Sequence, residues 1–362
     1  MNLQTFIFFV LLSYTHAKFS FTDPFESCET NAFPPKQSDA APRYIINLDL
    51  PPQERWTKLV TEKKNDVLAL IGDIRNLTLS LVGEKVFKVI IDNLDKIATT
   101  LPYPFNEEII GISKASGLNI SEATLYNIFY EVFTFCTSIV AQDTSGHLYH
   151  GRNLDFGLFM GWNPKTHTWT IAELLKPLVV QLEWQKGGKT GLFTFSLDER
   201  FGLNGGFVGL LEWVSFLTRE VMEEAKTYKE AKFMLSHTRL LAPVYFILGG
   251  VKSGEGSIIT RWRDNFHTDD LLDRMSGSGS WFLVETNYDQ WKTPPFFDDR
   301  RTPAVHCLNK GGQKNASPKL LYNVLSTRPV LNKLTTYTSL MDVNRGTLGA
   351  WLRKCEDPCW PW

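Results

Sequence analysis

The sequence predicts an α+β protein whose first part is mainly helical and whose remainder is mainly strands. Before Phe133 the apolar residues recur at intervals of three and four, and after Cys136 they recur at intervals of two. The chain has 362 residues and a hydrophobic content of 43%, which is enough to fill a sizeable core. We therefore expect a globular protein with a change of structural character near Cys136.

The first seventeen residues have the features of a secretory signal peptide. An apolar run from Phe6 to Tyr14 is followed by the small residue Ala17, which suits cleavage before Lys18. The run is much shorter than the roughly 20 residues that cross a bilayer, so a membrane anchor is the weaker interpretation. Three Asn-x-Ser/Thr patterns agree with entry into the secretory pathway, and they predict glycosylation at Asn76, Asn119 and Asn315.

Helical periodicity covers the chain from Gln53 to Phe133. Val86, Ile90 and Leu94 illustrate the spacing, which places one apolar stripe on a helix. Ser121 precedes a second periodic run and is therefore the expected cap of a helix that ends near Cys136.

Strand periodicity begins directly after Cys136. Thr137–Gln142 and His147–His150 are expected to form a hairpin around the turn at 143–146. The further strands expected are 178–185, 192–196, 244–248, 257–262, 281–285 and 334–338, with a turn at 186–189 and a helix at about 208–225.

The five cysteines are odd in number, so one should remain a thiol in an oxidising compartment. Cys355 and Cys359 are close in sequence and flank a turn at Pro358, which favours a disulfide between them. Cys136 lies at the change from helix to strand and is the best candidate thiol. A buried cysteine is more often a small core residue than a nucleophile, so this position alone does not establish catalysis.

Charge and motif content argue against several function classes. Lys and Arg number 38 and Asp and Glu number 39, so the net charge of -1 gives no field that would gather nucleic acid. No glycine-rich segment has the strand-to-helix context of a phosphate-binding loop. His147 and His150 are three residues apart on an expected strand, which sends them to opposite faces and makes a structural role more reasonable than a metal pair.

Two segments resemble a known enzyme family. Cys136–Asp143 and Gly146–Gly157 closely resemble the corresponding segments of the acid ceramidase family of N-terminal nucleophile cysteine hydrolases. Further resemblance extends over almost the whole chain, at 47–52, 198–201, 242–250, 286–289, 298–304 and 355–362. The related N-acylethanolamine-hydrolysing acid amidases share the Cys-Thr-Ser and Gly-Arg-Asn-Leu-Asp cores but lack the C-terminal cysteine pair.

This resemblance implies a fold and a maturation step. The fold is the αββα sandwich of N-terminal nucleophile hydrolases, with an additional N-terminal helical subunit. The implied organisation is a signal peptide at 1–17, a helical alpha subunit at 18–135 and a catalytic beta subunit at 136–362. Autocleavage between Phe135 and Cys136 would release an α-amine on the nucleophile, and this amine could act as the base that the thiol needs.

The same resemblance assigns the site residues. Cys136 is the implied nucleophile, Arg152 favours its thiolate and Asp155 orients its amine. Asn287 donates to the oxyanion, a role that suits an amide. Glu199 and Arg300 complete the polar wall of the site. Without the family, a structural ion pair would be the simpler interpretation of these last two residues.

The resemblance also implies a disulfide, partners and a location. Together with the cysteine count, it implies that Cys28 and Cys307 join the two subunits. The expected substrate is ceramide or a related N-acyl lipid at a membrane surface, with a lipid-presenting helper protein as a further partner and no cofactor. The lysosome is the expected location, with secretion as an alternative. Within the enzyme class, the related amidases make N-acylethanolamine hydrolysis the alternative. The family also carries a further stretch between Thr190 and Gly191 that this chain lacks, so a catalytically impaired variant of the same fold is a second alternative.

Overall fold

The computed structural model describes residues 25, 27–98, 100–125, 134–157, 160–191, 196–199 and 214–359. The expected signal peptide at 1–17 lies outside these residues. Within the described ranges, no helix combines the length and the apolar character that crossing a membrane requires.

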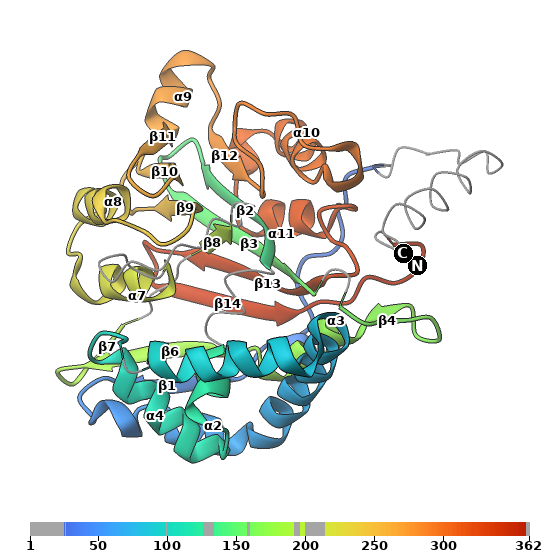
Figure 1. The fold of residues 1–362 in the computed structure, drawn as a ribbon. Coiled ribbons are helices and arrows are strands. Elements are labelled where there is room, and N and C mark those ends of the chain that lie inside the picture. Colours follow the sequence, from blue (N-terminus) through green and yellow to red (C-terminus); the bar gives the residue numbers. More distant parts are fainter. Residues whose placement is uncertain are drawn as a thin grey trace.

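A five-stranded antiparallel sheet forms the centre of the molecule, in the order β12-β2-β3-β13-β14 (Figure 1). Strand β2 (Thr134–Gln142) and strand β3 (Leu148–Phe156) form the expected hairpin. Strand β3 is six residues longer at its end than expected, and it reaches Phe156 rather than His150. The alternation of apolar residues stops early because β3 is buried on both faces and carries polar residues that serve the site.

The remaining strands of this sheet complete its two sides. Strand β12 (Phe282–Glu285) pairs with β2, while β13 (Thr335–Asp342) pairs with β3 and then with β14 (Thr347–Leu352). All of these pairs are antiparallel.

A second sheet has the order β11-β10-β9-β8. Its strands are β8 (Ser196–Glu199), β9 (Val244–Gly249), β10 (Gly256–Arg261) and β11 (Phe266–Asp270), again paired antiparallel. The strands expected at 244–248 and 257–262 are confirmed within one residue, because both are buried segments with β-branched or aromatic residues between clear turns.

The two sheets pack face to face between two helical layers. Val140 and Leu283 of the first sheet contact Tyr245 and Ile247 of the second, which forms the core between the sheets. Because successive side chains on a strand point to opposite faces, Ile139 lies on the other face of β2. Ile139 packs there with residues of α10 (Arg301–Gly311) and α11 (Pro318–Ser326).

The outer face of the second sheet is covered in the same way. Phe246 and Ile259 pack against Leu217 of α7 (Val214–Glu224) and Leu235 of α8 (Tyr228–His237). The order helix, sheet, sheet, helix is visible in Figure 1 and confirms the expected αββα sandwich.

The first part of the chain is helical as expected. It contains α2 (Thr57–Glu62), α3 (Lys64–Ala98), which is kinked at Gly83, and α4 (Phe105–Ser116). Residues 120–125 are also helical, but Asn119 rather than Ser121 caps them. The Asn119 side chain accepts a hydrogen bond from the Glu122 backbone at 2.7 Å, and Glu122 accepts one from the Asn119 backbone at 3.3 Å. This reciprocal pair is a capping box, which holds the helix start two residues earlier than expected.

One strand of the first part joins a third sheet. Strand β1 (Arg43–Asn47) pairs in parallel with β6 (Gln181–Lys186), which pairs with β7 (Lys189–Gly191). The return after β6 therefore begins at Lys189 and not at Leu192. Gly187 and Gly188 both have positive φ, so they form a two-residue turn that allows immediate pairing.

The other short elements connect these layers. They are η1 (Gln37–Asp39), η2 (Pro52–Glu54), β4 (Trp162–Asn163), β5 (Thr168–Trp169), α6 (Thr170–Leu175), η3 (Lys176–Leu178), α9 (Leu271–Gly277), η4 (Phe296–Asp298) and η5 (Gln313–Asn315).

Both expected disulfides are present. Cys28 is bonded to Cys307, and Cys355 is bonded to Cys359. Cys136 forms no disulfide and is buried, which confirms its place as the remaining thiol.

Candidate active site

The Cys136 thiol lies on the face of β2 that points toward the second sheet. Cys136 and Val140 are four residues apart on one strand, so they share a face, and Val140 belongs to the core between the sheets. Arg152 lies opposite Ser138 on β3 and reaches the same face. Its Nη2 donates to Cys136 Sγ at 2.7 Å, and both side chains are buried. A guanidinium in this position stabilises a thiolate relative to a thiol.

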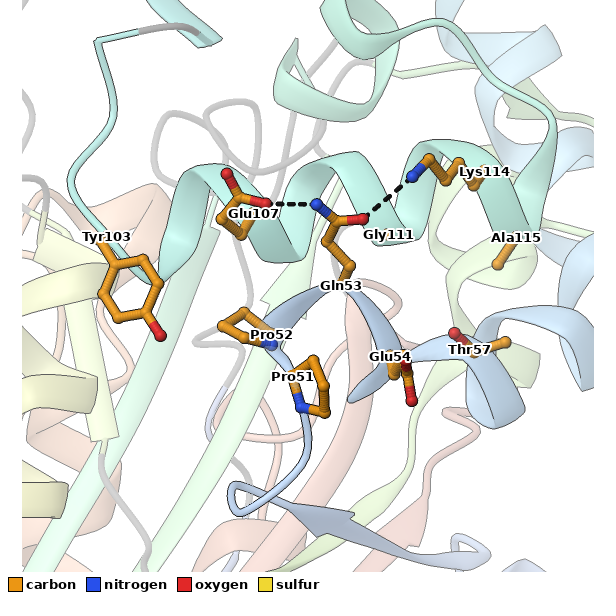
Figure 2. Close-up of a pocket in the computed structure, with 10 residues that line it drawn as sticks. All are labelled: Pro51, Pro52, Gln53, Glu54, Thr57, Tyr103, Glu107, Gly111, Lys114 and Ala115. Carbon is orange, nitrogen blue, oxygen red and sulfur yellow. Dashed lines mark hydrogen bonds between the residues drawn. The ribbon is translucent and has the colours of Figure 1, made fainter.

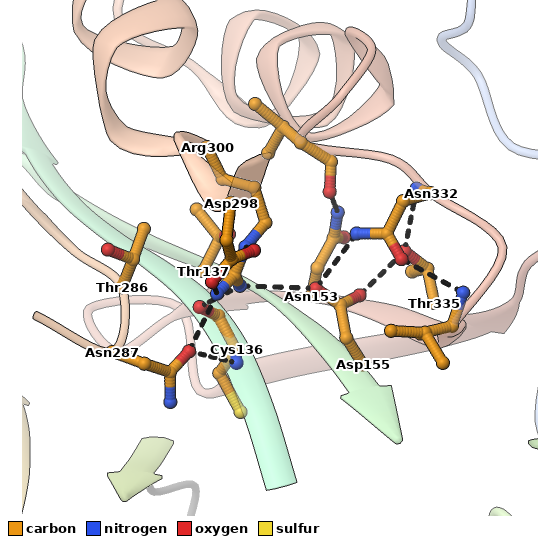
Figure 3. Close-up of polar contacts among 12 residues, drawn as sticks. Cys136, Thr137, Asn153, Asp155, Thr286, Asn287, Asp298, Arg300, Asn332 and Thr335 are labelled. Carbon is orange, nitrogen blue, oxygen red and sulfur yellow. Dashed lines mark hydrogen bonds and ion pairs between the residues drawn. The ribbon is translucent and has the colours of Figure 1, made fainter. Parts of the chain in front are cut away.

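Arg300 approaches Cys136 from the opposite face of the sheet. It precedes α10, and its Nη1 donates to the Cys136 carbonyl oxygen at 2.5 Å and to Asp155 Oδ2 at 3.2 Å. Its Nε donates to Asp298 Oδ1 at 2.8 Å (Figure 3). Two carboxylates compensate the charge of this fully buried guanidinium, and together they raise the pKa of Arg300 despite its burial. Arg300 therefore stays charged and holds the backbone of the nucleophile.

The side chain of Asn287 contacts both Cys136 and Arg300. Its Oδ1 accepts from the Cys136 backbone N–H at 3.0 Å and from Arg300 Nη2 at 2.8 Å. Two donors at one oxygen fix the orientation of the amide, since its other end carries only donors. Figure 3 shows the nitrogen end of the Asn287 amide directed away from Arg300. This arrangement leaves Asn287 suited to donate a hydrogen bond near the nucleophile.

Asp155 lies on the same face as Arg300, because it is opposite Phe135 in the β2–β3 register. Thr335 donates to its Oδ1 at 2.6 Å and Asn332 donates to its Oδ2 at 3.1 Å. Burial raises the pKa of Asp155 above its usual value, although Arg300 and these two hydrogen bonds oppose the increase. Asn332, Thr335 and Asp298 were not predicted as site residues, and no local sequence pattern distinguishes them.

Glu199 is the last residue of β8, where its backbone pairs with Val244 of β9. The structure describes no more of Glu199 than this, so its expected place in the wall of the site stays a prediction. Among the described residues, the acidic partners of Arg300 are Asp155 and Asp298. The alternative of an ion pair between Glu199 and Arg300 stays untested, because the Glu199 side chain lies outside the described part of the chain.

The two histidines of the hairpin have other surroundings. His147 Nε2 lies 2.9 Å from Asp342 Oδ1 at the end of β13. Burial, with a contribution from Arg152, lowers the pKa of His150 to about 3, so His150 is neutral. In the described part of the chain, no three His, Cys, Asp or Glu side chains are grouped to hold a metal ion.

A cavity of about 730 Å³ lies elsewhere, between η2 and α4 (Figure 2). Gly111 allows the close packing of these elements, because a Cβ at this position would lie 2.1 Å from the Gln53 carbonyl oxygen. Gln53 accepts a hydrogen bond from Lys114 at 3.0 Å and donates one to Glu107. This cavity is formed entirely by residues 51–115 and does not include the nucleophile.

Two family models match the chain. Residues 136–349 match the linear amide C–N hydrolases of the choloylglycine hydrolase family. Residues 39–101 match the beta subunit of N-acylethanolamine-hydrolyzing acid amidase. The first match begins at the residue that was expected to become the new N-terminus.

Individual relatives extend the similarity over most of the chain. The acid ceramidases of Homo sapiens and Mus musculus are each 45% identical over 369 residues, which covers 93% of this chain and 93% of each relative. The aligned length exceeds the 362 residues of this chain, which agrees with residues in the relatives that have no counterpart here. Among solved structures, a Caenorhabditis elegans N-acylethanolamine-hydrolyzing acid amidase ortholog is 31% identical, with a TM-score of 0.48, and covers 60% of this chain and 100% of its own.

Proposed function

Since the chain belongs to the acid ceramidase family of linear amide C–N hydrolases, we propose that this amidase hydrolyses ceramide to sphingosine and a fatty acid. The observation that carries the proposal is the pair of contacts at Cys136. Arg152 donates to its thiol and Asn287 accepts from its backbone nitrogen. The thiol of Cys136 and its backbone nitrogen, which becomes the α-amine after cleavage, are therefore both held in place at the site.

The first reaction is autocleavage. Cys136 Sγ attacks the carbonyl carbon of Phe135, and the Cys136 nitrogen takes the thiol proton and leaves as an α-amine. Water then hydrolyses the thioester and releases the Phe135 carboxylate. The products are an alpha subunit that ends at Phe135 and a beta subunit that begins at Cys136.

Turnover repeats this chemistry on the lipid. The α-amine takes the thiol proton, and Sγ attacks the amide carbonyl of the N-acylsphingosine. Asn287 donates to the oxyanion that develops, and sphingosine leaves with the proton from the α-ammonium group. Water then attacks the thioester, which releases the fatty acid and restores the thiol.

The other charged side chains act on Cys136 from the two faces of β2. Arg152 stabilises the thiolate from the face between the sheets. Arg300 and Asp155 act from the helical face, where Arg300 binds the Cys136 carbonyl oxygen and orients Asn287. Glu199 forms part of the polar wall of the site.

The location is the lysosome, with secretion as an alternative, and the apolar run before Lys18 supports entry into the secretory pathway. Asn76, Asn119 and Asn315 are exposed, which suits glycan acceptors. Ceramide is met at a membrane surface, with a lipid-presenting helper protein as a further partner. Treatment of the secreted protein with an endoglycosidase tests the glycans directly.

N-acylethanolamine hydrolysis is the second candidate, because the acid amidase model matches residues 39–101. The deciding experiment incubates the purified chain at acid pH, determines the new N-terminus and measures turnover of ceramide and an N-acylethanolamine side by side. Faster ceramide turnover by a chain that begins at Cys136 supports the proposal. A folded, cleaved chain that hydrolyses neither lipid would refute it and indicate a catalytically impaired variant, in which the absent stretch after Thr190 should be restored.

A further inference from the structure

The turn that carries Asn287 is clamped by a second arginine. This turn follows β12 and spans residues 286–292. Arg301 Nη1 donates to the Lys292 carbonyl oxygen at 3.0 Å and to the Asp289 carbonyl oxygen at 3.3 Å. Its Nη2 donates to the carbonyl oxygens of Tyr288 and, at 3.3 Å, Asp289. One side chain therefore binds three backbone carbonyls just after Asn287.

A buried carboxylate holds the beginning of the same turn. Glu285 is fully buried, and its Oε1 accepts from the Thr286 backbone N–H at 2.9 Å. Arg301 Nη2 lies 3.7 Å from this oxygen and is therefore positioned to compensate the charge. Gln290 donates both to Glu285 and, at 3.0 Å, to the Val284 carbonyl oxygen. A buried carboxylate without a cation would be costly, so Arg301 stabilises the turn at both of its ends.

Arg300 and Arg301 act on Asn287 from two sides. Arg300 binds the side chain of Asn287, and Arg301 binds the backbone that follows it. Both arginines are fixed by α10, since Arg300 precedes this helix and Arg301 is its first residue. Ala304 and Leu308 anchor the same helix in the core.

We propose that Arg301 is a positioning residue that acts through Asn287, and this inference rests on the proposed amidase function. Arg301 binds the backbone of the turn that follows Asn287, and its effect is to set where the Asn287 amide lies. A misplacement of about 1 Å at a reacting centre can cost about 100-fold in rate. Loss of Arg301 should therefore lower kcat by roughly 10- to 100-fold while KM changes by less than about 3-fold.

A double-mutant cycle tests this role. The four proteins are the wild type, Arg301→Gln, Asn287→Ala and the double variant, each assayed with N-palmitoylsphingosine in detergent micelles and normalised to the fraction that begins at Cys136. If Arg301 acts through Asn287, Arg301→Gln should cost little further kcat once Asn287 is alanine. Two independent, multiplicative losses would overturn the proposal, because Arg301 would then act by another route.

Two further variants separate positioning from folding. Arg301→Lys keeps a cation beside Glu285 and should fold, with kcat between those of the wild type and Arg301→Gln. Arg328→Gln is the matched control, because Arg328 also donates to two backbone carbonyls, those of Pro358 and Glu356, in the C-terminal tail. Arg328→Gln should leave kcat unchanged. An equal loss of kcat in Arg328→Gln would show a general folding effect and refute the role of Arg301.

The rate of autocleavage is measured for the same four proteins, because this reaction needs no lipid. In the precursor, Asn287 accepts from the nitrogen of the bond to be cleaved, so the same coupling is expected. A wild type that cleaves itself but does not hydrolyse the lipid would refute the proposed substrate, while the autocleavage cycle still decides the role of Arg301. A folded wild type that does neither would overturn both.

Discussion

The buried carboxylate of Glu108 joins the two parts of the chain that autocleavage would separate. Glu108 lies on α4, and Arg219 lies on α7 beyond the expected cleavage point. Arg219 binds both oxygens of Glu108, and Arg55 and Trp56 donate to them at 2.8 Å and 2.7 Å. The Arg219 guanidinium also lies over the Trp184 ring, 5.0 Å from its centroid. The substitution Glu108→Gln removes this charge from both arginines, although Arg219 keeps Glu223, which accepts from its Nε at 2.9 Å.

The size of the loss follows from burial. The side chains of Glu108 and Arg219 are only 5% and 10% exposed. Removal of one partner from such a buried ion pair typically costs about 3 to 5 kcal/mol. With an unfolding entropy of about 2.1 cal/mol/K per residue, this loss corresponds to a decrease in Tm of roughly 4 to 7 °C for a chain of this length.

The contribution of Glu108 to the stability of the fold should persist at mildly acidic pH. Burial alone would raise the pKa of Glu108, but the hydrogen bonds and charge of Arg219, with Trp56 and Arg55, hold this pKa below its usual value. A carboxylate with a lowered folded-state pKa stabilises the fold above its unfolded-state pKa, and the effect is lost as the pH falls through the folded-state pKa. The Tm difference between wild type and Glu108→Gln should thus stay constant down to about pH 5 and shrink only below this value.

The assay is thermal unfolding of both proteins between pH 4 and pH 7, with Glu183→Gln as the control. Glu183 pairs with Arg43 at 3.1 Å and also joins the two parts of the chain, but Arg43 is 58% exposed. Such a surface pair contributes about 0 to 1 kcal/mol. If Glu108→Gln lowers Tm no more than Glu183→Gln does, the reasoning from burial is wrong.

Three further predictions concern the site and the subunits. Cys136→Ala should remain a single chain at acid pH, and N-terminal sequencing that still finds cleavage after Phe135 would point to an outside protease. Asn287→Ala should lower kcat by about 100- to 1,000-fold in a folded, cleaved protein, as measured by ceramide turnover, and a loss below about 10-fold would exclude it as the oxyanion donor. After cleavage, denaturing electrophoresis should show one band without reductant and two with it, because Cys28 and Cys307 join the subunits; two bands without reductant would contradict this.

Local sequence patterns predicted the elements that local forces determine. The change in apolar spacing near Cys136 predicted the start of β2, and the hairpin around residues 143–146 was found at its correct place. The end of the helix expected near Cys136 falls on residues 126–133, which lie outside the described residues. The odd cysteine count and the short tail loop left three cysteines, and the position of Cys136 at the change of periodicity made it the best candidate for the thiol that the structure shows. These features depend on interactions between residues a few positions apart, so they can be predicted directly from the sequence.

Elements stabilised by partners far away in the sequence were harder to predict from sequence patterns. Strand β1 was not expected in the helical part, because its pairing partner β6 lies 138 residues further along in register, from Arg43 to Gln181. The end of β3 was missed because polar residues of the site interrupt its apolar pattern. In both cases tertiary contacts outweigh the local preference.

The candidate active site also has a part that the sequence predicted and a part that only the tertiary structure determined. The residues alone predicted a thiol at Cys136, which the structure places in β2. A family resemblance, rather than any local pattern, named Arg152, Asp155, Asn287 and Arg300 as its companions. Only the tertiary structure decided that Arg152 and Arg300 act from opposite faces of β2, and that Asp298, Asn332 and Thr335 hold the charged groups in place. Asn287 and Arg300 are 151 and 164 residues from Cys136 along the chain. Their approach depends on the order of strands in the sheet and on the packing of α10 against it, and no periodicity within a segment encodes either.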